Sequence, residues 1–197
     1  NGVPGVVHLG LGAFHRAHQA LVFDDMLGRG DRRWGVLGVA MHTPVLADAL
    51  LAQEGLYAVQ IASSAGTHWH IGGAIWRTCV AARERAKVVE SIAAPGTRWV
   101  TLTVTEKGYG DELAALLVSG LSARRVAGGT GLTIASCDNL SSNGRKLKAL
   151  CVSAARAIDP VLADWIETRC AFPDSMVDRI VPAATAQRLA AAAQAMG

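Results

Sequence analysis

The sequence predicts an α/β fold in which helices cover both faces of a doubly wound, mostly parallel β-sheet. Short apolar runs of strand length alternate with helical segments along the 197 residues, which is the pattern of such folds. Polar, charged and glycine residues follow directly after several of these runs. A region at 56–80 alternates with a period of two residues and predicts an inserted antiparallel strand segment.

Each expected element rests on a local signal. Continuous or alternating apolar runs predict strands, spacings of three and four residues predict helices, and glycine or proline marks their ends. Thr43 before Pro44 predicts a helix start with Thr43 as the N-cap, and the pair Asp159–Pro160 predicts another helix start. The expected elements, in order, are a strand at 5–10, a helix at 13–27, a strand at 34–41, a helix from 43, two or three strands within 56–80, a helix at 82–93, a strand at 98–105, a helix at 111–125, a strand at 131–137, helices at 147–158 and 159–169, a strand at 176–181 and a helix at 185–196.

The spacing of apolar residues also predicts which face of a helix is buried. Phe14, Ala17 and Leu21 would share one face of the helix at 13–27. The best-patterned helix would bury a face that runs from Leu147 to Ile158 at spacings of three and four residues. Both helices would therefore pack on the sheet through these faces.

Composition and charge exclude several functional classes. The hydrophobic fraction is 51% and the charged fraction is 18%, which is typical of a globular protein. The formal net charge is only +3 and the arginines are scattered, so nucleic acid is not an expected partner. No apolar run reaches the roughly 18 residues that cross a membrane, and no signal peptide is visible. The four cysteines form no C-x-x-C pair, which predicts unpaired thiols and a reducing, cytoplasmic location.

The stretch HLGLGAFHRAH at 8–18 is typical of a Rossmann-type dinucleotide-binding loop. Gly10 and Gly12 fall at the first two positions of G-x-G-x-x-G, and His15 replaces the third glycine. The first glycine permits a tight turn and the second lets the backbone approach a pyrophosphate, which would face the N–H groups at the following helix start. The same two glycines also fit a strand-to-helix turn without a ligand.

The end of the second strand departs from the dinucleotide pattern. An acidic residue is expected there for the adenosine ribose, but GVAMHT offers His42 and Thr43. Because neither a carboxylate nor an arginine is present, the choice between NAD and NADP stays open. The loop alone is compatible with a dehydrogenase domain, a non-enzymatic dinucleotide sensor or a methyltransferase, although a methyltransferase would also need an acidic residue at this position.

Four blocks, HLGLGAFHRAHQALVFDD, EKGYG, SCDNLSSNG and FPDSMVDRIVPAAT, resemble in content and order the polyol-specific long-chain dehydrogenases, or mannitol dehydrogenase family. The loop of that family is G-x-G-x-F-x-R, which Phe14 and Arg16 match and which accommodates His15. The resemblance implies a Rossmann domain that binds NAD, with NADP not excluded. It also implies hydride transfer to or from a secondary alcohol of a sugar alcohol or aldonate, of the mannitol–fructose or mannonate–fructuronate type.

The resemblance assigns roles to individual residues. The amide of Asn139 would hold the substrate oxygen as charge develops on it, which makes Asn139 the expected catalytic residue. Glu106 and Lys107 would contact the substrate. A metal is not expected, because His68 and His70 lie on one strand face without a third ligand. The expected cofactor-binding residues are Gly10, Gly12, Ala13, Phe14, Arg16, Asp138 and Asp178.

The resemblance also implies a second domain. The base of the family is a lysine within a K-x-x-x-x-N-x-x-H motif of a C-terminal helical domain, and no histidine follows His70 here. We therefore expect residues 1–185 to form the dinucleotide-binding domain and 186–197 to be the helical start of a C-terminal domain not included in this chain. The family usually has a longer segment after E-K-G-Y, where this chain has only Gly110 before the next helix. Either this member is shortened there or residues are missing.

Several residues have a structural interpretation beside the functional one. We expect His8 to be a hydrogen-bonded core histidine and Cys137 to be part of a packed strand end. The arginines at 124–125 would terminate a helix, and Asp24 would be solvated on the first helix. Asn139 could alternatively cap the turn before the helix that follows it.

Overall fold

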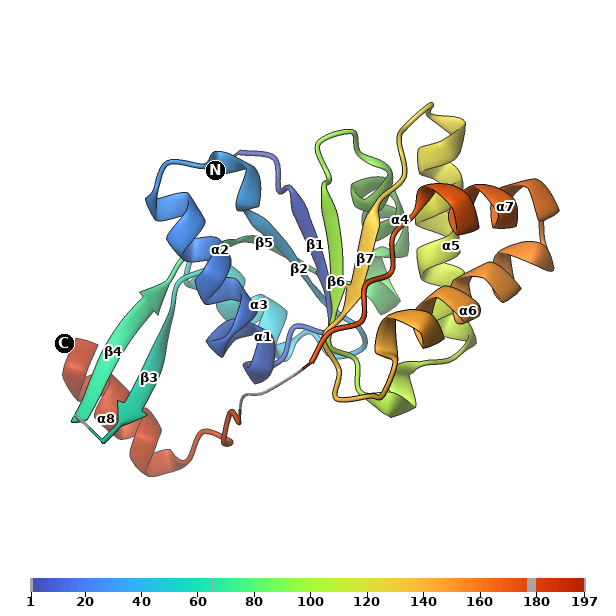
Figure 1. Cartoon of the computed structure of the whole chain (residues 1–197). Coiled ribbons are helices and arrows are strands. Elements are labelled where there is room, and N and C mark those ends of the chain that lie inside the picture. Colours follow the sequence, from blue (N-terminus) through green and yellow to red (C-terminus); the bar gives the residue numbers. More distant parts are fainter. Residues whose placement is uncertain (1, 65, 177–179, 197) are drawn as a thin grey trace.

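The computed structural model describes residues 2–64, 66–176 and 180–196. Five parallel strands form one sheet in the order β5-β2-β1-β6-β7, which confirms the predicted fold class (Figure 1). The chain fills one half of the sheet outward from β1 and then returns to place β6 on the other side of β1, so the strand order reverses between β1 and β6. Open parallel sheets bind ligands at such a reversal. The strands of the sheet are β1 (Val6–Leu9), β2 (Val36–Ala40), β5 (Ile75–Val80), β6 (Trp99–Leu102) and β7 (Thr133–Ser136).

Helices cover both faces of the sheet (Figure 1). The helices α1 (Ala13–Ala17), α2 (Gln19–Gly28) and α3 (Val45–Ala52) lie on one face. The helices α4 (Ala81–Ala93), α5 (Asp111–Val126) and α6 (Asn143–Arg156) lie on the other, with α7 (Pro160–Arg169) packed against α6. The short 3-10 turns η1 (Arg32–Trp34) and η2 (Glu106–Gly108) precede β2 and α5, and α8 (Ala186–Met196) ends the described chain beside the hairpin.

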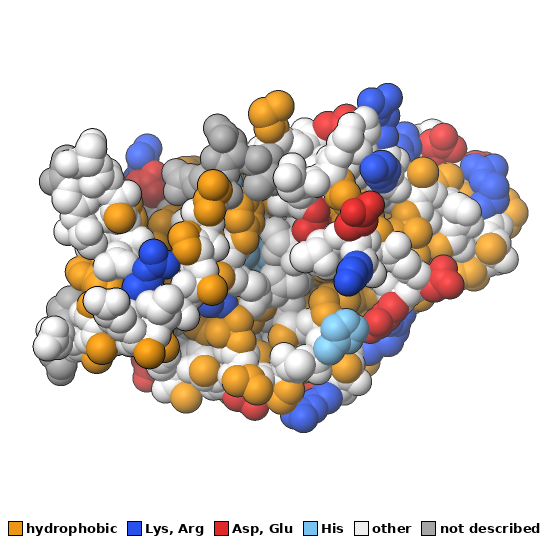
Figure 2. Space-filling view, turned by 90° about the horizontal axis from the view of Figure 1, so that it is seen from below, with side chains coloured by type: hydrophobic (Ala, Val, Ile, Leu, Met, Phe, Trp, Pro, Cys, Tyr) orange, Lys and Arg blue, Asp and Glu red, His pale blue; other side chains and the backbone are white. Residues whose placement is uncertain are grey.

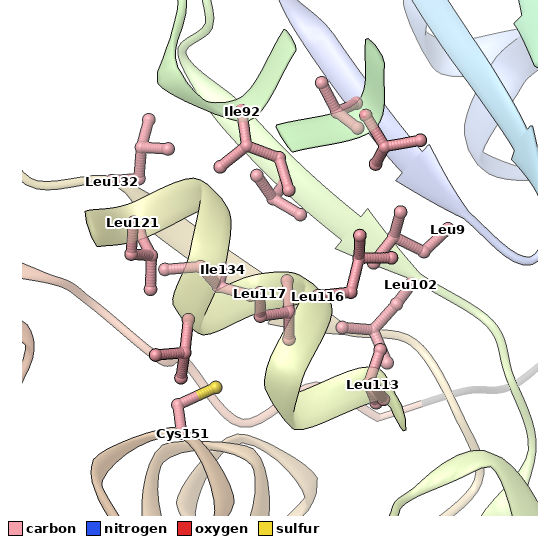
Figure 3. Packing of buried hydrophobic residues seen from close by; sticks show 14 of the residues in the cluster. Leu9, Ile92, Leu102, Leu113, Leu116, Leu117, Leu121, Leu132, Ile134 and Cys151 are labelled. Carbon is pink, nitrogen blue, oxygen red and sulfur yellow. The ribbon is translucent and has the colours of Figure 1, made fainter. Parts of the chain in front are cut away.

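Two hydrophobic cores result because side chains of a strand alternate between its faces. In β1, Val7 and Leu9 face the larger core under α4 and α5, while Val6 faces the smaller core under α2 and α3. Figure 3 shows the larger core, in which leucines of α5 pack on Leu102 and Ile134. Both faces of the sheet are therefore buried, and its edge at the carboxyl ends of the strands remains for a site.

The region at 56–80 contains the inserted antiparallel segment that the sequence predicts. The strands β3 (Tyr57–Ser63) and β4 (Gly66–Gly72) pair as a separate antiparallel hairpin, while β5 joins the main sheet parallel to β2. Asp24 of α2 holds the base of this hairpin. Its carboxylate accepts hydrogen bonds from the Gly73 N–H at 2.9 Å and from His70 Nε2 at 2.9 Å. The expectation that Asp24 is solvated is wrong, because these two donors hold it in a half-buried position.

The helix expected at 13–27 is broken in two. His18 has φ −132° and ψ −82°, so α1 and α2 have separate axes. The predicted buried face assumes one continuous helix, so its spacing of three and four residues does not hold across this break. Phe14, Ala17 and Leu21 are therefore only half-buried, and the predicted face is wrong. The buried residues of the two helices are instead His15, Ala20 and Phe23.

Helix ends agree with the sequence where a side chain caps them. The helix α7 begins at Pro160 as predicted, and Asp159 Oδ1 caps it by accepting a hydrogen bond from Val161 N at 2.9 Å. The cap expected at Thr43 is wrong, since α3 begins one residue later with Pro44 at the N-cap position. Ile158 is 73% exposed, because α6 ends at Arg156 and the following turn leads into α7.

The strand expected at 176–181 is absent at the residues of this range that the structure describes. Met176, Ile180 and Val181 lie outside any strand, and residues 177–179, which include Asp178, lie outside the described residues. The four cysteines are free thiols. Across the described ranges, the helices fall short of the combined length and apolarity that crossing a bilayer requires.

Candidate active site

The carboxyl ends of β1, β2 and β6 surround a crevice of about 500 Å³. The loop 10–12 after β1, the segment 40–43 after β2 and the segments 103–105 and 110–113 after β6 line it. The crevice lies at the reversal of strand order, where a ligand site is expected. Figure 2 shows this edge of the molecule, on which charged side chains and backbone lie among apolar patches.

The turn at Gly10 requires glycine. Gly10 has φ +93°, and its N–H donates a hydrogen bond to the Val39 carbonyl at 2.9 Å. A Cβ at this position would lie 2.1 Å from the Thr103 carbonyl oxygen. The loop therefore crosses the end of β6 at a distance that only glycine allows.

Gly12 is different, because the fold does not require glycine there. Its φ of −101° and ψ of 177° are accessible to any residue. A Cβ at Gly12 would meet only the Gly10 carbonyl oxygen, at an ordinary contact distance of 3.7 Å. The residue lines the crevice and precedes the first turn of α1, whose N–H groups have no partner within the helix. The missing side chain leaves the backbone open to the crevice.

His8 of β1 is hydrogen-bonded to the backbone of the loop at 10–12. The ring is fully buried, and its Nε2 lies 3.1 Å from the Gly10 carbonyl oxygen and 3.0 Å from Thr103 Oγ1. Because a carbonyl can only accept, His8 carries its proton on Nε2. Its Nδ1 then accepts a hydrogen bond from the Thr101 hydroxyl at 2.8 Å. The predicted core histidine is confirmed, and its ring fixes the loop relative to β6.

His15, at the position of the missing third glycine, stacks on His8. The ring centroids are 3.4 Å apart and the planes differ by 12°. Burial lowers the pKa of His15 to about 4 and the pKa of His8 well below its usual value, so both rings are neutral near pH 7. His15 Nδ1 lies 3.1 Å from Gln19 Oε1. The pair of rings fills the space between α1 and the sheet that a glycine would close.

The chain of polar contacts continues from His15 to β7. The Gln19 amide donates a hydrogen bond to the Cys137 sulfur. Burial raises the pKa of the Cys137 thiol to about 11, so the thiol is protonated near neutral pH. Cys137 is therefore part of a packed strand end, as predicted, and not an activated nucleophile.

Asp138 fixes the connection between β6 and α5. Its carboxylate accepts hydrogen bonds from Thr105 N at 2.8 Å, from Val104 N at 3.2 Å and from the Tyr109 hydroxyl at 3.1 Å. Thr105 has φ +64°, a strained conformation for a β-branched residue, which these hydrogen bonds hold in place. The strand predicted at 98–105 ends at Leu102 for this reason. Burial also raises the pKa of Tyr109, whose hydroxyl contacts Ser136 as well.

Asn139 and Asn143 occupy different environments. Asn139 is exposed immediately after Asp138, and its side chain makes no hydrogen bond to a residue that the structure describes. The alternative of a turn cap at Asn139 is wrong, because the side chain that hydrogen-bonds within this turn is that of Asn143. Asn143 is buried, donates to the Asp138 carbonyl at 3.0 Å and accepts from Ser175 N at 2.9 Å. Sequence reasoning missed Asn143, although it belongs to the same SCDNLSSNG block.

The FPDS segment at 172–175 packs against the SCDNLSSNG block at 136–144. Asp174 Oδ1 accepts hydrogen bonds from Gly144 N at 2.9 Å and Arg145 N at 3.2 Å, so Asp174 caps α6 from outside the helix. Ser175 Oγ donates to the Ser136 carbonyl at 2.6 Å. A Cβ on Gly144 would lie 2.4 Å from the Pro173 carbonyl oxygen, so glycine permits the contact. The chain after α7 is thereby brought to the carboxyl end of β7.

The residues predicted for substrate and cofactor are only partly brought together. Gly10, Gly12 and Lys107 line the crevice, while Glu106 is exposed in the adjacent turn η2. Asp138 supports one wall of the crevice through the hydrogen bonds described above. Asp178 lies outside the described residues, so the structure does not locate it.

Three other predicted residues lie on the far side of the loop. Ala13 and Arg16 line a second cavity of about 410 Å³ between α1, the β3–β4 hairpin and the segment that leads into α8. Burial lowers the pKa of Arg16, and its Nη1 is buried without a hydrogen-bond partner among the described residues. Phe14 is half-buried and packs edge-on against His18 at 5.1 Å. These side chains support α1 from outside the crevice.

Two other candidate groups have structural roles. Arg124 and Arg125 lie in the last turn of α5, at the helix end where the sequence places them. Arg124 donates hydrogen bonds to the carbonyls of Thr130 at 2.6 Å and Ala94 at 2.7 Å. His70 contacts Asp24, and no group of three metal-ligating side chains occurs within the ranges that the structure describes.

Comparison with known proteins identifies the family. Residues 4–195 match the family described as mannitol dehydrogenase Rossmann domain. The chain belongs to the mannitol dehydrogenase family. This mannitol dehydrogenase domain is 36% identical to the D-mannonate oxidoreductase of Escherichia coli (strain K12) over 98% of the chain. It is 35% identical to the mannitol 2-dehydrogenase of Cereibacter sphaeroides over 91% of the chain.

A solved structure of the family has the same fold. The ternary complex of Pseudomonas fluorescens mannitol 2-dehydrogenase with NAD and D-mannitol matches 98% of the mannitol dehydrogenase domain with a TM-score of 0.87 and 29% identity. The chain spans 46% of that protein, 46% of the E. coli relative and 43% of the C. sphaeroides relative. The alignment with the E. coli relative extends over 221 residues, more than the 197 of this chain, so that relative contains residues which this chain lacks.

Proposed function

We propose that the protein transfers a hydride between NAD and a secondary alcohol of a sugar alcohol or aldonate, of the mannitol–fructose or mannonate–fructuronate type. The observation that carries the proposal is Gly12, a glycine that the fold does not require and that leaves backbone open to the crevice. The names of the relatives support the substrate class, and the ternary complex of the P. fluorescens relative supports NAD as the cofactor.

The residues around the crevice fit a dinucleotide. Gly10 and Gly12 would let the backbone approach the diphosphate, and the N–H groups at the start of α1 would donate hydrogen bonds to it. Ala13, Phe14 and Arg16 would hold this helix start in place, and Asp178 would lie at the nicotinamide end. When bound, the nicotinamide supplies the acceptor or donor of the hydride.

Substrate would lie at the carboxyl ends of β6 and β7. The exposed amide of Asn139 is available as a hydrogen-bond donor to the substrate oxygen, where it would stabilise negative charge as the hydroxyl proton leaves. Glu106 and Lys107, in the turn beside the crevice, would contact substrate hydroxyl groups. The proton itself would go to a lysine of a C-terminal helical domain, with residues 1–185 as the dinucleotide-binding domain and 186–197 as the start of that helical domain.

Replacing Gly12 by alanine tests the proposal. The Cβ has room in the fold, so Gly12→Ala should leave the unfolding free energy within about 0.5 kcal/mol of the wild type. It should weaken NAD binding about tenfold or more in calorimetric titration, because the methyl group blocks the diphosphate. Gly28→Ala, at an open position on α2, is the matched control and should leave NAD affinity unchanged. Unchanged affinity in Gly12→Ala would contradict the proposed site.

Turnover tests the enzymatic part separately. Full-length protein is mixed with NAD or NADP and with mannitol, arabitol or mannonate, and the reduced nicotinamide is followed by absorbance. We expect a signal with at least one pair. Binding of NAD without turnover on any substrate would favour the non-enzymatic sensor instead.

A further inference from the structure

A carboxylate of helix α5, that of Glu112, lines the crevice. Dinucleotide sites usually place an acidic residue at the end of the second strand to bind the adenosine ribose, and here Met41, His42 and Thr43 follow β2. These three residues line the crevice, as does Glu112 in the first turn of α5. Glu112 Oε1 lies 4.0 Å from His42 Nδ1. The sheet topology thus brings a carboxylate next to the segment that follows β2, although the β2 sequence lacks one.

We propose that Glu112 selects NAD against NADP. This inference rests on the proposed function, since it concerns the ribose end of the same site. NADP differs from NAD by a 2′-phosphate, which at pH 7 has a charge of about −1.5 to −2, as other phosphomonoesters do. A 2′-phosphate beside His42 would approach the Glu112 carboxylate, and the two anions would repel each other.

The other charged residues that line the crevice also disfavour a 2′-phosphate. Asp111 lies beside Glu112 and also lines the crevice, while Lys107 is the cation among the described lining residues. Two carboxylates and one ammonium group line the crevice, so the phosphate would enter a negative field. No arginine occurs among the described residues that line the crevice, so the usual phosphate-binding side chain is missing there. Figure 2 shows a histidine and an acidic side chain close together on this face.

Glu112 also has an ordinary structural explanation. Acidic residues in the first turn of a helix interact favourably with its dipole, and Asp111 and Glu112 both occupy that turn of α5. A purely helix-stabilising role predicts that removal of the charge lowers stability and leaves cofactor preference unchanged. The selective role predicts a change in the ratio of two affinities, which a loss of stability does not produce.

The test is calorimetric titration of NAD and NADP into the wild type, Glu112→Gln, Glu112→Lys and the control Glu90→Gln. Glu90 is an exposed acid on α4 away from the crevice. We expect Glu112→Gln to tighten NADP binding about fivefold, the size expected for exposed charges several ångströms apart in water, and to leave NAD binding within about twofold. Glu112→Lys should tighten NADP binding further. The differences should shrink in about 0.5 M salt, because exposed charges are screened.

The possible outcomes separate this inference from the proposed function. Wild-type protein that binds NAD while Glu112→Gln and Glu90→Gln show the same NADP-to-NAD ratio would overturn the role of Glu112 and leave the proposed function intact. Wild-type protein that binds NADP as tightly as NAD would also overturn the role of Glu112 and leave the proposed function intact. Wild-type protein that binds neither nucleotide would overturn both.

Discussion

Gly10→Ala should strongly destabilise the protein, through two separable effects. A left-handed φ costs an alanine about 1–2 kcal/mol. In addition, the Cβ would lie 2.1 Å from the Thr103 carbonyl oxygen, whereas Cβ atoms in proteins essentially never come closer than 3.0 Å to such an atom. Moving Thr103 away would strain the hydrogen bonds that Thr103 and His8 make to the Gly10 carbonyl, each of which contributes about 1 kcal/mol. The expected total loss of unfolding free energy is about 3–4 kcal/mol.

Two other glycines separate these effects. Gly30 has φ +90° with no atom within 4 Å of an added Cβ, so Gly30→Ala measures the backbone strain alone. Gly28 has neither a positive φ nor a close neighbour, so Gly28→Ala should be neutral or slightly stabilising. Unfolding in urea is followed by tryptophan fluorescence for each variant. The reasoning fails if Gly10→Ala is no less stable than Gly30→Ala, because the steric effect would then be absent.

The remaining predictions concern pH and two asparagines. Because burial lowers the pKa of His15 to about 4 in the folded state, the unfolded chain binds the proton first as the pH falls. The unfolding free energy should therefore fall between about pH 6.5 and pH 4, with His15 contributing up to about 3 kcal/mol of the loss. His15→Gln should lose correspondingly less in urea unfolding across this range, and an equal loss would refute the assignment. Asn139→Ala should leave stability and NAD affinity unchanged but lower the turnover of the full-length protein about a hundredfold. Asn143→Ala should lose about 2–3 kcal/mol of stability, since its partners would be buried without hydrogen bonds, and equal effects of the two substitutions on stability would contradict these assignments.

Local patterns predicted most of the element order, because periodicity and turn residues act over a few positions. The pair Asp159–Pro160 marked the start of α7, and the glycine at position 10 marked the turn after β1. The break at His18 had no local signal. It accompanies the stacking of His15 on His8 and the packing of Phe23 on Trp34, which are contacts with residues of other elements.

The candidate site was less predictable than the fold, because its geometry depends on contacts between distant residues. Asp138 was singled out, but its hydrogen bonds to the turn after β6 join positions more than 30 residues apart. Asn143 was missed because its partner Ser175 belongs to a segment on the far side of α7. Glu112 reaches the crevice only because β6 lies next to β1 in the sheet.

The row of side chains from His8 through His15 and Gln19 to Cys137 connects the first strand of the sheet with the last. One end of this row touches the Gly10 carbonyl, and the other adjoins the residue pair Asp138 and Asn139. The row therefore links the two ends of the crevice edge through side chains, in addition to the backbone pairing of β1 with β6 and of β6 with β7. Shortening Gln19 would break this side-chain link between His15 and Cys137 while every residue that faces a ligand stayed the same.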